Sequence, residues 1–462
     1  MQEKAVFQHQ EKINEVLSRG LERHLFPEHL ELTPNLNEVY ELALAFYESQ
    51  ILTNDEIIQN GAYFARVGTK VTRHFLLCTG EPLRLPQHSS SRLKSFFGNN
   101  QFKTGYATHG LFPYRGKFHP QMIKALINIM GLKPGDTILD PMMGSGTVLI
   151  EASLMGIKSV GLDASPFCKF MSQTKLDALT ITTVPLHEAL KQYKECFNHF
   201  TKIAEYPNQE AKVQNKLPSS QNNLPVEKAY PFNQDFSKQH EFFNTSLQPE
   251  VYNLLLLAYL DSAGYAQRSS RKPPLELFRA ILERYVFVVE KINRVLKDTE
   301  SSLARGKTFS GDARSIPLET QTVEGILFSP PYSFAIDYIK NDSFHLKYMG
   351  ENITELKNRM IGLRGKTFRE KINLYMQDMD KVLSECARVL GPSRFCTIIV
   401  GTNDNQLSNA LGVPREEVSG LHKIFINLAS NHGFSLVRLL SRQIMGMANT
   451  MREEFIVILQ RV

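Results

Sequence analysis

The stretch Leu139-Asp140-Pro141-Met142-Met143-Gly144-Ser145-Gly146-Thr147 joins an apolar run, 137–139, to a segment of helical composition, 148–155. A strand, a turn with two glycines and a helix, in that order, are typical of the nucleotide-binding start of a doubly wound α/β domain. A second stretch, Phe328-Ser329-Pro330-Pro331-Tyr332, ends another apolar run far downstream. The fold is decided by the first stretch, and the chemistry by the two together.

Seven apolar runs predict the strands of this domain, and the last two are close enough to pair as an antiparallel hairpin at the sheet edge. The runs are 137–140, 159–163, 307–311, 323–328, 395–401, 435–442 and 453–460. The alternation of strands and helices stops between them. We therefore expect a helical N-terminal region (1–105, with a helix within 62–85), a first part of the α/β domain (106–179), a helical insertion (180–305) and a second part (306–462).

Composition narrows the class of protein. The 462 residues are 42% hydrophobic and 22% charged, and 53 basic against 47 acidic side chains give a net charge of +6. These values are ordinary for a globular protein, and they permit a nucleic-acid partner without requiring one. The five cysteines contain no C-x-x-C pair, which argues against a disulfide framework or a metal site. No signal-peptide core or membrane-spanning run is evident, so a cytoplasmic location is expected.

The acids after the strands indicate which cofactor the glycine turn holds. The third glycine of G-x-G-x-x-G is missing, and Asp140 stands where it would repel a phosphate. An acid there suits a cationic ligand with an amine, such as S-adenosylmethionine. We expect Asp140 to bind its methionine end, Asp163 its ribose hydroxyls and Asp312 its adenine amino group, because all three follow strands. The alternative is that they are ordinary loop acids.

The two motifs together resemble the amino-group DNA methyltransferases, which make N4-methylcytosine or N6-methyladenine. The resemblance covers about 106–175 and 307–401 with the edge hairpin, but neither 1–100 nor 180–305. It implies a Rossmann-like class I methyltransferase fold and S-adenosylmethionine as cofactor. The expected cofactor-binding residues are Lys117, Phe118, His119, Pro120, Asp140, Pro141, Met142, Gly144, Ser145, Gly146, Thr147, Asp163, Ala164, Asp312 and Ala313.

The resemblance also assigns the catalytic roles to Ser329, Pro330, Pro331 and Tyr332. An exocyclic amine is a poor nucleophile, and two acceptors, the Ser329 hydroxyl and the Pro330 carbonyl, can orient it toward a sulfonium methyl. Tyr332 would stack on the flipped base, and the prolines stiffen the loop. Serine in the first place favours cytosine N4 over adenine N6. The motif has no cysteine, which excludes methylation at cytosine C5. A strand terminator is the alternative for the Pro-Pro pair.

Double-stranded DNA is the expected partner. The residues expected to hold it are Arg115, Arg268, Arg271, Lys272, Arg364 and Lys366. The insertion is a candidate target-recognition region or, alternatively, a helical contact surface. A restriction endonuclease or defence-system partner would fit the resemblance, and the oligomeric state is left open. The rival functions are tRNA guanine N2 methylation, methylation of a protein glutamine amide and a non-catalytic nucleic-acid-binding subunit.

Overall fold

The computed structural model describes most of the chain between residues 24 and 462. The described ranges are 24–85, 94, 105–114, 116–214, 247–268, 273–331, 338–402, 407–408, 412–415, 420–443 and 453–462, with the side chains of 204–214, 268 and 402 left out. Within these ranges, no helix combines the length and the apolar character needed to cross a bilayer.

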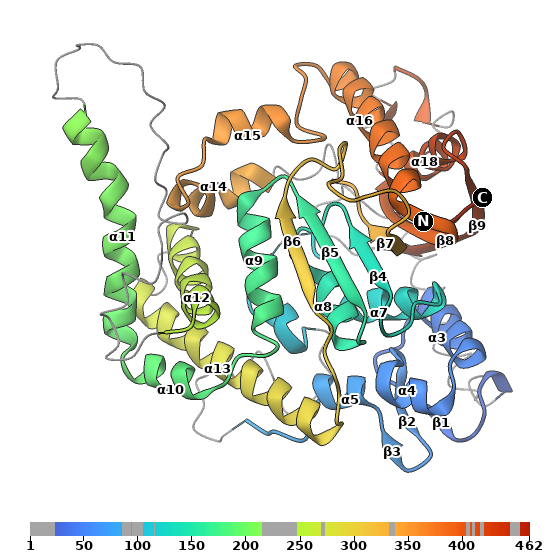
Figure 1. Ribbon diagram of the computed structural model, residues 1–462, viewed down its shortest axis with the longest axis horizontal. Coiled ribbons are helices and arrows are strands. Elements are labelled where there is room, and N and C mark those ends of the chain that lie inside the picture. Colours follow the sequence, from blue (N-terminus) through green and yellow to red (C-terminus); the bar gives the residue numbers. More distant parts are fainter. Residues whose placement is uncertain are drawn as a thin grey trace, which may run out of the picture.

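A seven-stranded sheet forms the centre of the molecule (Figure 1), in the order β6-β5-β4-β7-β8-β10-β9. The strands are β4 (Thr137–Asp140), β5 (Lys158–Asp163), β6 (Gly306–Ser310), β7 (Val323–Phe328), β8 (Leu390–Thr402), β9 (Phe434–Gln443) and β10 (Glu453–Arg461). The pairs from β6 to β8 are parallel, whereas β10 is antiparallel to both β8 and β9. All seven predicted strands, the C-terminal hairpin and the Rossmann-like class I methyltransferase fold are confirmed.

Helices cover both faces of this sheet because the central strands are apolar on both sides. Ile138 and Leu327 belong to one buried cluster, while their neighbours Leu139 and Phe328 belong to the other. This is the alternation of a strand that is buried on two faces. The first face carries α7 (Pro120–Ile129), α8 (Thr147–Leu154) and α9 (Pro166–Asp177), and the second carries α16 (Phe368–Val389) and α18 (Leu421–Ser430).

The described residues between α9 and β6 form four helices. They are α10 (Val184–Lys191), α11 (Tyr193–Gln214), α12 (Pro249–Arg268) and α13 (Pro274–Asp298). Helices α12 and α13 share the buried cluster of the α9 face, and Arg284 pairs with the buried Asp261 at 2.8 Å. The insertion is therefore part of the core. Two further helices, α14 (Tyr338–Tyr348) and α15 (Ile353–Arg359), follow β7.

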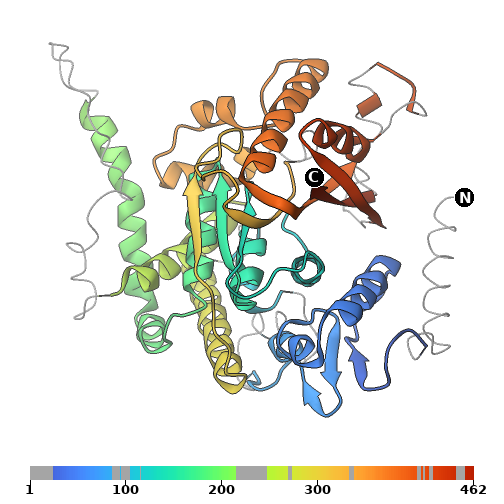
Figure 2. The same cartoon turned by 45° about the vertical axis from the view of Figure 1, so that its right-hand side comes forward.

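The N-terminal region contains the predicted helices and also a small sheet that the sequence analysis misses. Helices α3 (Val39–Ile51), α4 (Asn54–Asn60) and α5 (Arg73–Cys78) accompany strands β1 (Leu30–Leu32), β2 (Phe64–Val67) and β3 (Lys70–Val71). The helix expected within 62–85 is confirmed only as α5. Strands β2 and β3 form a tight hairpin in which Gly68 has φ +58°, a conformation that glycine adopts readily. Figures 1 and 2 place this region at the opposite end of the molecule from α14, α15 and α16.

Candidate active site

The two motifs meet because their strands are neighbours. Strand β4 pairs with β7 in parallel, with Ile138 opposite Gly325 and Leu139 opposite Ile326. Chain order reverses at this pair, since β5 and β6 lie on one side of β4 and β8 lies beyond β7. Open α/β sheets bind their ligands beyond the carboxyl ends of strands at such a switch point. The loop after β4 and the loop after β7 accordingly line one pocket.

This pocket encloses about 990 Å³, part of it open to solvent. It gathers most of the residues that the sequence analysis assigns to cofactor and catalysis. Those that line it are Lys117, Phe118, Pro141, Met142, Gly144, Ser145, Thr147, Asp163, Ala164, Asp312, Ala313, Ser329, Pro330 and Pro331. His119, Pro120, Asp140 and Gly146 are not among the described residues that form its wall.

The remaining predicted residues either do not line the pocket or are not among the residues that the structure describes. Tyr332, Arg115, Arg271 and Lys272 lie outside the described residues, as does the side chain of Arg268. Lys366 is exposed at the surface, just before α16. Arg364 is discussed with its ion pair below.

The glycine turn is fixed by its neighbours. Gly144 has φ +48° and Gly146 has φ +76°. A Cβ on Gly146 would stand 2.9 Å from the side chain of Ser172, so a larger residue does not fit there. The Ser172 hydroxyl donates to the Gly144 carbonyl at 2.9 Å, and the Gly144 amide donates to Asp163 at 2.9 Å. The turn therefore presents backbone to the pocket.

Asp163 holds two loops at once. Its carboxylate accepts from the amides of Gly144 and Ser165, the latter at 2.8 Å. Burial raises the pKa of this carboxyl despite those hydrogen bonds. The Cys168 side chain also hydrogen-bonds to this carboxylate, and since a carboxylate offers about four acceptor positions, one remains for a ligand. Asp163 thus fits the predicted role of an acceptor for ribose hydroxyls.

Asp140 does not line the pocket but lies directly behind residues that do. Its neighbours Pro141 and Met142 line the pocket, while Asp140 itself is fully buried. One oxygen accepts from the Met142 amide at 3.0 Å, and within the described part of the chain the other has no hydrogen-bond partner. Burial raises the pKa of this carboxyl well above its ordinary value. A buried acid with an unused oxygen fits a cationic ligand such as S-adenosylmethionine better than a phosphate.

Asp312 belongs to an ion-pair chain that the sequence analysis misses. Arg314 grips both of its oxygens, with Nε 2.9 Å from Oδ1 and Nη2 2.6 Å from Oδ2. Arg314 also pairs with Asp378 of α16 at 2.8 Å and donates to the Arg359 carbonyl at 3.0 Å. These bonds outweigh the effect of burial and lower the pKa of Asp312. This series of ion pairs therefore connects Asp312 to Arg359 on the opposite wall of the pocket.

Arg364 completes the same network by pairing with Asp378, whose side chain is only 3% exposed. From the sequence, Arg364 is predicted to bind a phosphate group of DNA. In the structure its guanidinium instead pairs with a buried acid beneath the pocket wall, and Arg314 and Arg364 both contact the same oxygen of Asp378. Arg364 is thus a support of the wall.

The loop after β7 places two acceptors side by side. The Ser329 hydroxyl donates to the Pro330 carbonyl at 3.5 Å, which leaves the lone pairs of the hydroxyl oxygen for another donor. The next carbonyl, that of Pro331, accepts from Tyr375 of α16 at 3.1 Å. This bond anchors the loop to the helix below it.

Two aromatic residues, Tyr114 and Tyr338, complete the pocket. The Tyr114 ring lies 3.5 Å from where a Cβ on Gly144 would be, and its hydroxyl is 3.4 Å from the Cys168 sulfur. Tyr114 and Tyr338 stack with centroids 6.5 Å apart and planes 16° apart. Asp342 of α14 is buried at the same place. The aromatic run 106–114 is the signal for Tyr114, whereas nothing in the sequence singles out Asp342.

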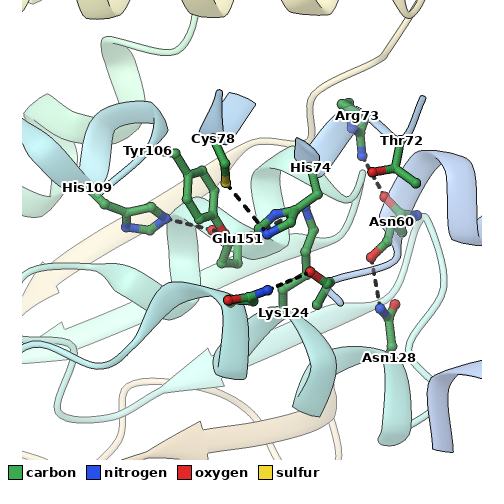
Figure 3. Close-up of polar contacts among 12 residues, drawn as sticks. Asn60, Thr72, Arg73, His74, Cys78, Tyr106, His109, Lys124, Asn128 and Glu151 are labelled. Atoms are coloured by element: carbon green, nitrogen blue, oxygen red, sulfur yellow. Dashed lines mark hydrogen bonds and ion pairs between the residues drawn. The ribbon is translucent and has the colours of Figure 1, made fainter. Parts of the chain in front are cut away.

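A buried polar network surrounds Glu151 of α8, the helix that begins at the glycine turn (Figure 3). Glu151 of α8 accepts from Tyr106 at 2.5 Å and from His109 at 2.6 Å, and it lies 3.7 Å from Lys124. Burial favours a raised pKa for Glu151, but Lys124 and the two hydrogen bonds outweigh burial and lower it. The His109 carbonyl in turn accepts from Lys117 at 3.3 Å. The network thereby locks the Lys117 segment to the helix that begins at the glycine turn.

Comparisons with known proteins indicate a methyltransferase. Residues 111–217 match the family model of UPF0020, the RMKL-like methyltransferase domain. The Type II methyltransferase M.BsoBI of Geobacillus stearothermophilus is 22% identical over 300 residues, which are 56% of this chain and 57% of that protein. The Type II methyltransferase M.MjaII of Methanocaldococcus jannaschii is 44% identical over 73 residues, 16% of this chain and 14% of that protein.

A tRNA (guanine(10)-N2)-dimethyltransferase of Methanothermobacter thermautotrophicus is 48% identical over 52 residues, 11% of this chain and 16% of that protein. The chain spans less than two-thirds of the length of each of these relatives.

Fold, pocket and family match together define an S-adenosylmethionine-dependent methyltransferase domain of the Rossmann-like class. The resemblance to the DNA methyltransferases is likewise confirmed, by the two type II enzymes. S-adenosylmethionine is the cofactor.

Proposed function

We propose that this chain methylates the exocyclic amino group of a base in double-stranded DNA, with cytosine N4 as the favoured target. The observation that carries the proposal is that Ser329 and Pro330 line the same pocket as Gly144 and Asp163. An acceptor pair suited to an amine thus faces a site suited to a cationic methyl donor.

Bound S-adenosylmethionine would supply an electrophilic methyl group on its sulfonium. The backbone of the glycine turn and the Asp163 carboxylate would hold it, and the buried Asp140 would favour its positive charge. Asp312, which lines the pocket and is held by Arg314, would accept a hydrogen bond from the adenine amino group.

The acceptor base would enter beside Ser329. Its amine has two N–H bonds, which the Ser329 hydroxyl and the Pro330 carbonyl would accept. Held in this way, the nitrogen turns its lone pair out of conjugation with the ring and toward the methyl group. As positive charge develops on the nitrogen, both acceptors become stronger hydrogen-bond partners, so they stabilise the transition state more than the ground state. The carbon–sulfur bond would break as the carbon–nitrogen bond forms, and the cationic nitrogen would then give up one proton to water, so no strong base is required.

Two features support DNA as the polymer and cytosine as the base. The relative with the longest match reported above is a type II methyltransferase. The motif begins with Ser329, which the family resemblance links to cytosine N4. A restriction endonuclease or defence-system partner and a cytoplasmic location accompany this proposal. Adenine N6 is the variant of the same reaction that the site also accommodates.

Methylation of guanine N2 in tRNA is the second candidate function. It is favoured by the tRNA dimethyltransferase that is 48% identical over 52 residues. That match is confined to a short part of both chains. The serine at position 329 also departs from the Asp or Asn that such enzymes place there.

Side-by-side methyl transfer separates the two functions. The purified chain is given S-adenosylmethionine with a labelled methyl group together with duplex DNA or tRNA, and the modified nucleosides are identified by mass spectrometry. We expect N4-methylcytosine from DNA. If tRNA yields N2-methylguanine and the DNA receives no label, the DNA proposal is overturned. If DNA yields N6-methyladenine, DNA remains the substrate and only the assignment of the target base changes.

A further inference from the structure

One segment of the chain concentrates positive charge next to the pocket. Residues 338–371 contain eight Lys or Arg against four Asp or Glu, a net charge of +4, whereas the whole chain carries +6. Six of the eight cations are exposed: Lys340, Lys347, Lys357, Arg359, Lys366 and Arg369. We call residues 338–371 the basic segment.

The acids of the basic segment are already counted in this net charge, and one of them, Glu351, lies close enough to Arg359 to interact with its charge. Asp342 is buried in the pocket wall, and the Glu370 carboxylate accepts from the Lys366 amide at 2.8 Å at the start of α16. The fourth acid, Glu355, lies in the first turn of α15, where a negative charge favours the helix N-terminus.

The basic segment forms one side of the pocket. Ile339, Asp342 and Leu346 of α14 line it, as do Arg359, Met360 and Ile361 at the end of α15. Figures 1 and 2 show α14, α15 and the beginning of α16 beyond the tips of β4, β5 and β6, the end of the sheet at which the pocket opens.

The helical insertion holds this segment in place. Tyr348 of α14 donates to the Phe200 carbonyl of α11 at 3.1 Å, and His345 of α14 donates to the Leu260 carbonyl of α12 at 3.2 Å. A Cβ on Gly264 would stand 2.6 Å from His345, so α12 and α14 are in close contact. The insertion therefore packs against α14 and holds it in position.

A base that reaches Ser329 stays joined through its sugar to phosphates on both sides. Those phosphates must lie at the mouth of the pocket, within the length of one nucleotide. Arginine and lysine side chains neutralise phosphates there and release the counterions that DNA carries. Arg359, in the pocket wall and also exposed, is the cation best placed to do so.

We propose that the basic segment 338–371 binds the phosphate backbone of the DNA strand whose base enters the pocket, and that the helical insertion supports this segment. The inference rests on the proposed DNA substrate. It moves the main DNA contact from the insertion, where the sequence suggests a target-recognition region, to the helices that follow the catalytic motif.

The salt dependence of DNA binding tests the proposal. The logarithm of the affinity falls linearly with the logarithm of the salt concentration, and each phosphate contact adds roughly 0.9 to the slope. We expect Arg359→Gln to reduce the slope by about 1 and the double variant Lys366→Ala/Arg369→Ala to reduce it by about 1 to 2. Cofactor affinity, measured by calorimetry, should stay unchanged in the double variant, which shows that it is folded.

Two matched variants serve as controls. Lys158→Ala/Lys297→Ala removes two exposed cations near the opposite end of the sheet, at the start of β5 and the end of α13, and should keep the wild-type slope. The exchange Lys366→Arg/Arg369→Lys keeps the charge and should also keep the slope.

Suppose that the protein methylates DNA, but that Arg359→Gln and the Lys366/Arg369 double variant both keep the wild-type salt dependence of DNA binding. This result would overturn the inference and leave the proposed function intact. Methyl transfer to tRNA without transfer to DNA would overturn both.

Discussion

The two loops that meet in the pocket are held in different ways. The glycine turn after β4 is fixed by residues close to it in the sheet: Asp163 at the end of β5 and Ser172 on α9. The Ser329 loop after β7 is fixed from further along the chain, by Tyr375 of α16. The glycine turn of the cofactor half is thus held by residues near it in the chain, whereas the acceptor loop depends on a helix further along the chain. We expect changes in the first to affect cofactor affinity and changes in the second to affect the rate of transfer.

Ser329→Ala should have the largest effect and the most selective one. It removes an acceptor of the target amine and touches no contact of the glycine turn, so the rate of methyl transfer should fall roughly 100-fold or more. Cofactor affinity, measured by calorimetry, should remain that of the wild type. A loss of cofactor affinity in this variant would show that the two halves are not separate.

Asp163→Ala tests the other half. It removes the predicted ribose acceptor together with hydrogen bonds to two amides, and hydrogen bonds to a charged group contribute about 1.5–3 kcal/mol each. We expect the dissociation constant of the cofactor to rise at least roughly 10-fold. Saturating cofactor should restore most of the transfer rate. A variant that binds the cofactor normally would refute the ribose assignment.

Arg314→Met probes the link between the halves. The guanidinium fixes Asp312 and the Arg359 carbonyl, while Asp378 keeps its pair with Arg364. We expect the KM for S-adenosylmethionine to rise about 10-fold with kcat within a few-fold of wild type. Arg314→Lys should recover only part of the affinity, because lysine cannot make the bidentate pair. A fall in kcat at unchanged KM would place Arg314 on the acceptor side instead.

The pH dependence of cofactor affinity gives the smallest of these effects. Burial raises the pKa of both Asp140 and Asp163 in the free protein. Their ionised forms are therefore disfavoured on folding, and stability is lost as the pH rises through their ordinary range and toward the raised values. A bound cation favours the ionised forms, so binding should release protons and affinity should increase with pH. The increase should reach up to about tenfold per pH unit for one coupled proton.

Asp140→Asn supplies the matching control for that measurement. It removes one titrating group while it keeps an acceptor for the Met142 amide. The pH slope should flatten in this variant, and an unchanged slope would assign the coupled proton to Asp163 alone.

Much of the fold could be predicted because the relevant signals are local. The runs at 137–140 and 323–328 coincide with β4 and β7, since strands buried on both faces appear as continuous apolar segments. The start of α4 is a local signal of the same kind, because Thr53 and Glu56 form a capping box there. Strand β8 begins earlier than expected, at Leu390, because the chain passes directly from α16 into it.

The unpredicted parts depend on residues that are distant in sequence. Arg314 resembles any exposed arginine until Asp378, on a helix far downstream, is placed beside it. Arg364 likewise resembles an exposed basic residue in a loop until its partner Asp378 is known. Asp342 lies on a helix with no motif, and only the packing of α14 against the pocket gives it a position. Sequence motifs identify the groups that perform the chemistry, whereas the groups that hold them emerge only from the folded structure.

The pairing of β4 with β7 also has a consequence for synthesis on the ribosome. These neighbours in the sheet are separated in the chain by the whole helical insertion and by β5 and β6. Ribosomes add about 5–20 residues per second, so the Ser329 loop would be made on the order of tens of seconds after the glycine turn. During that interval the nascent chain has the cofactor turn but no acceptor loop beside it. A newly made chain therefore has two of its three predicted cofactor acids, Asp140 and Asp163, well before it has an acceptor loop for the methyl group.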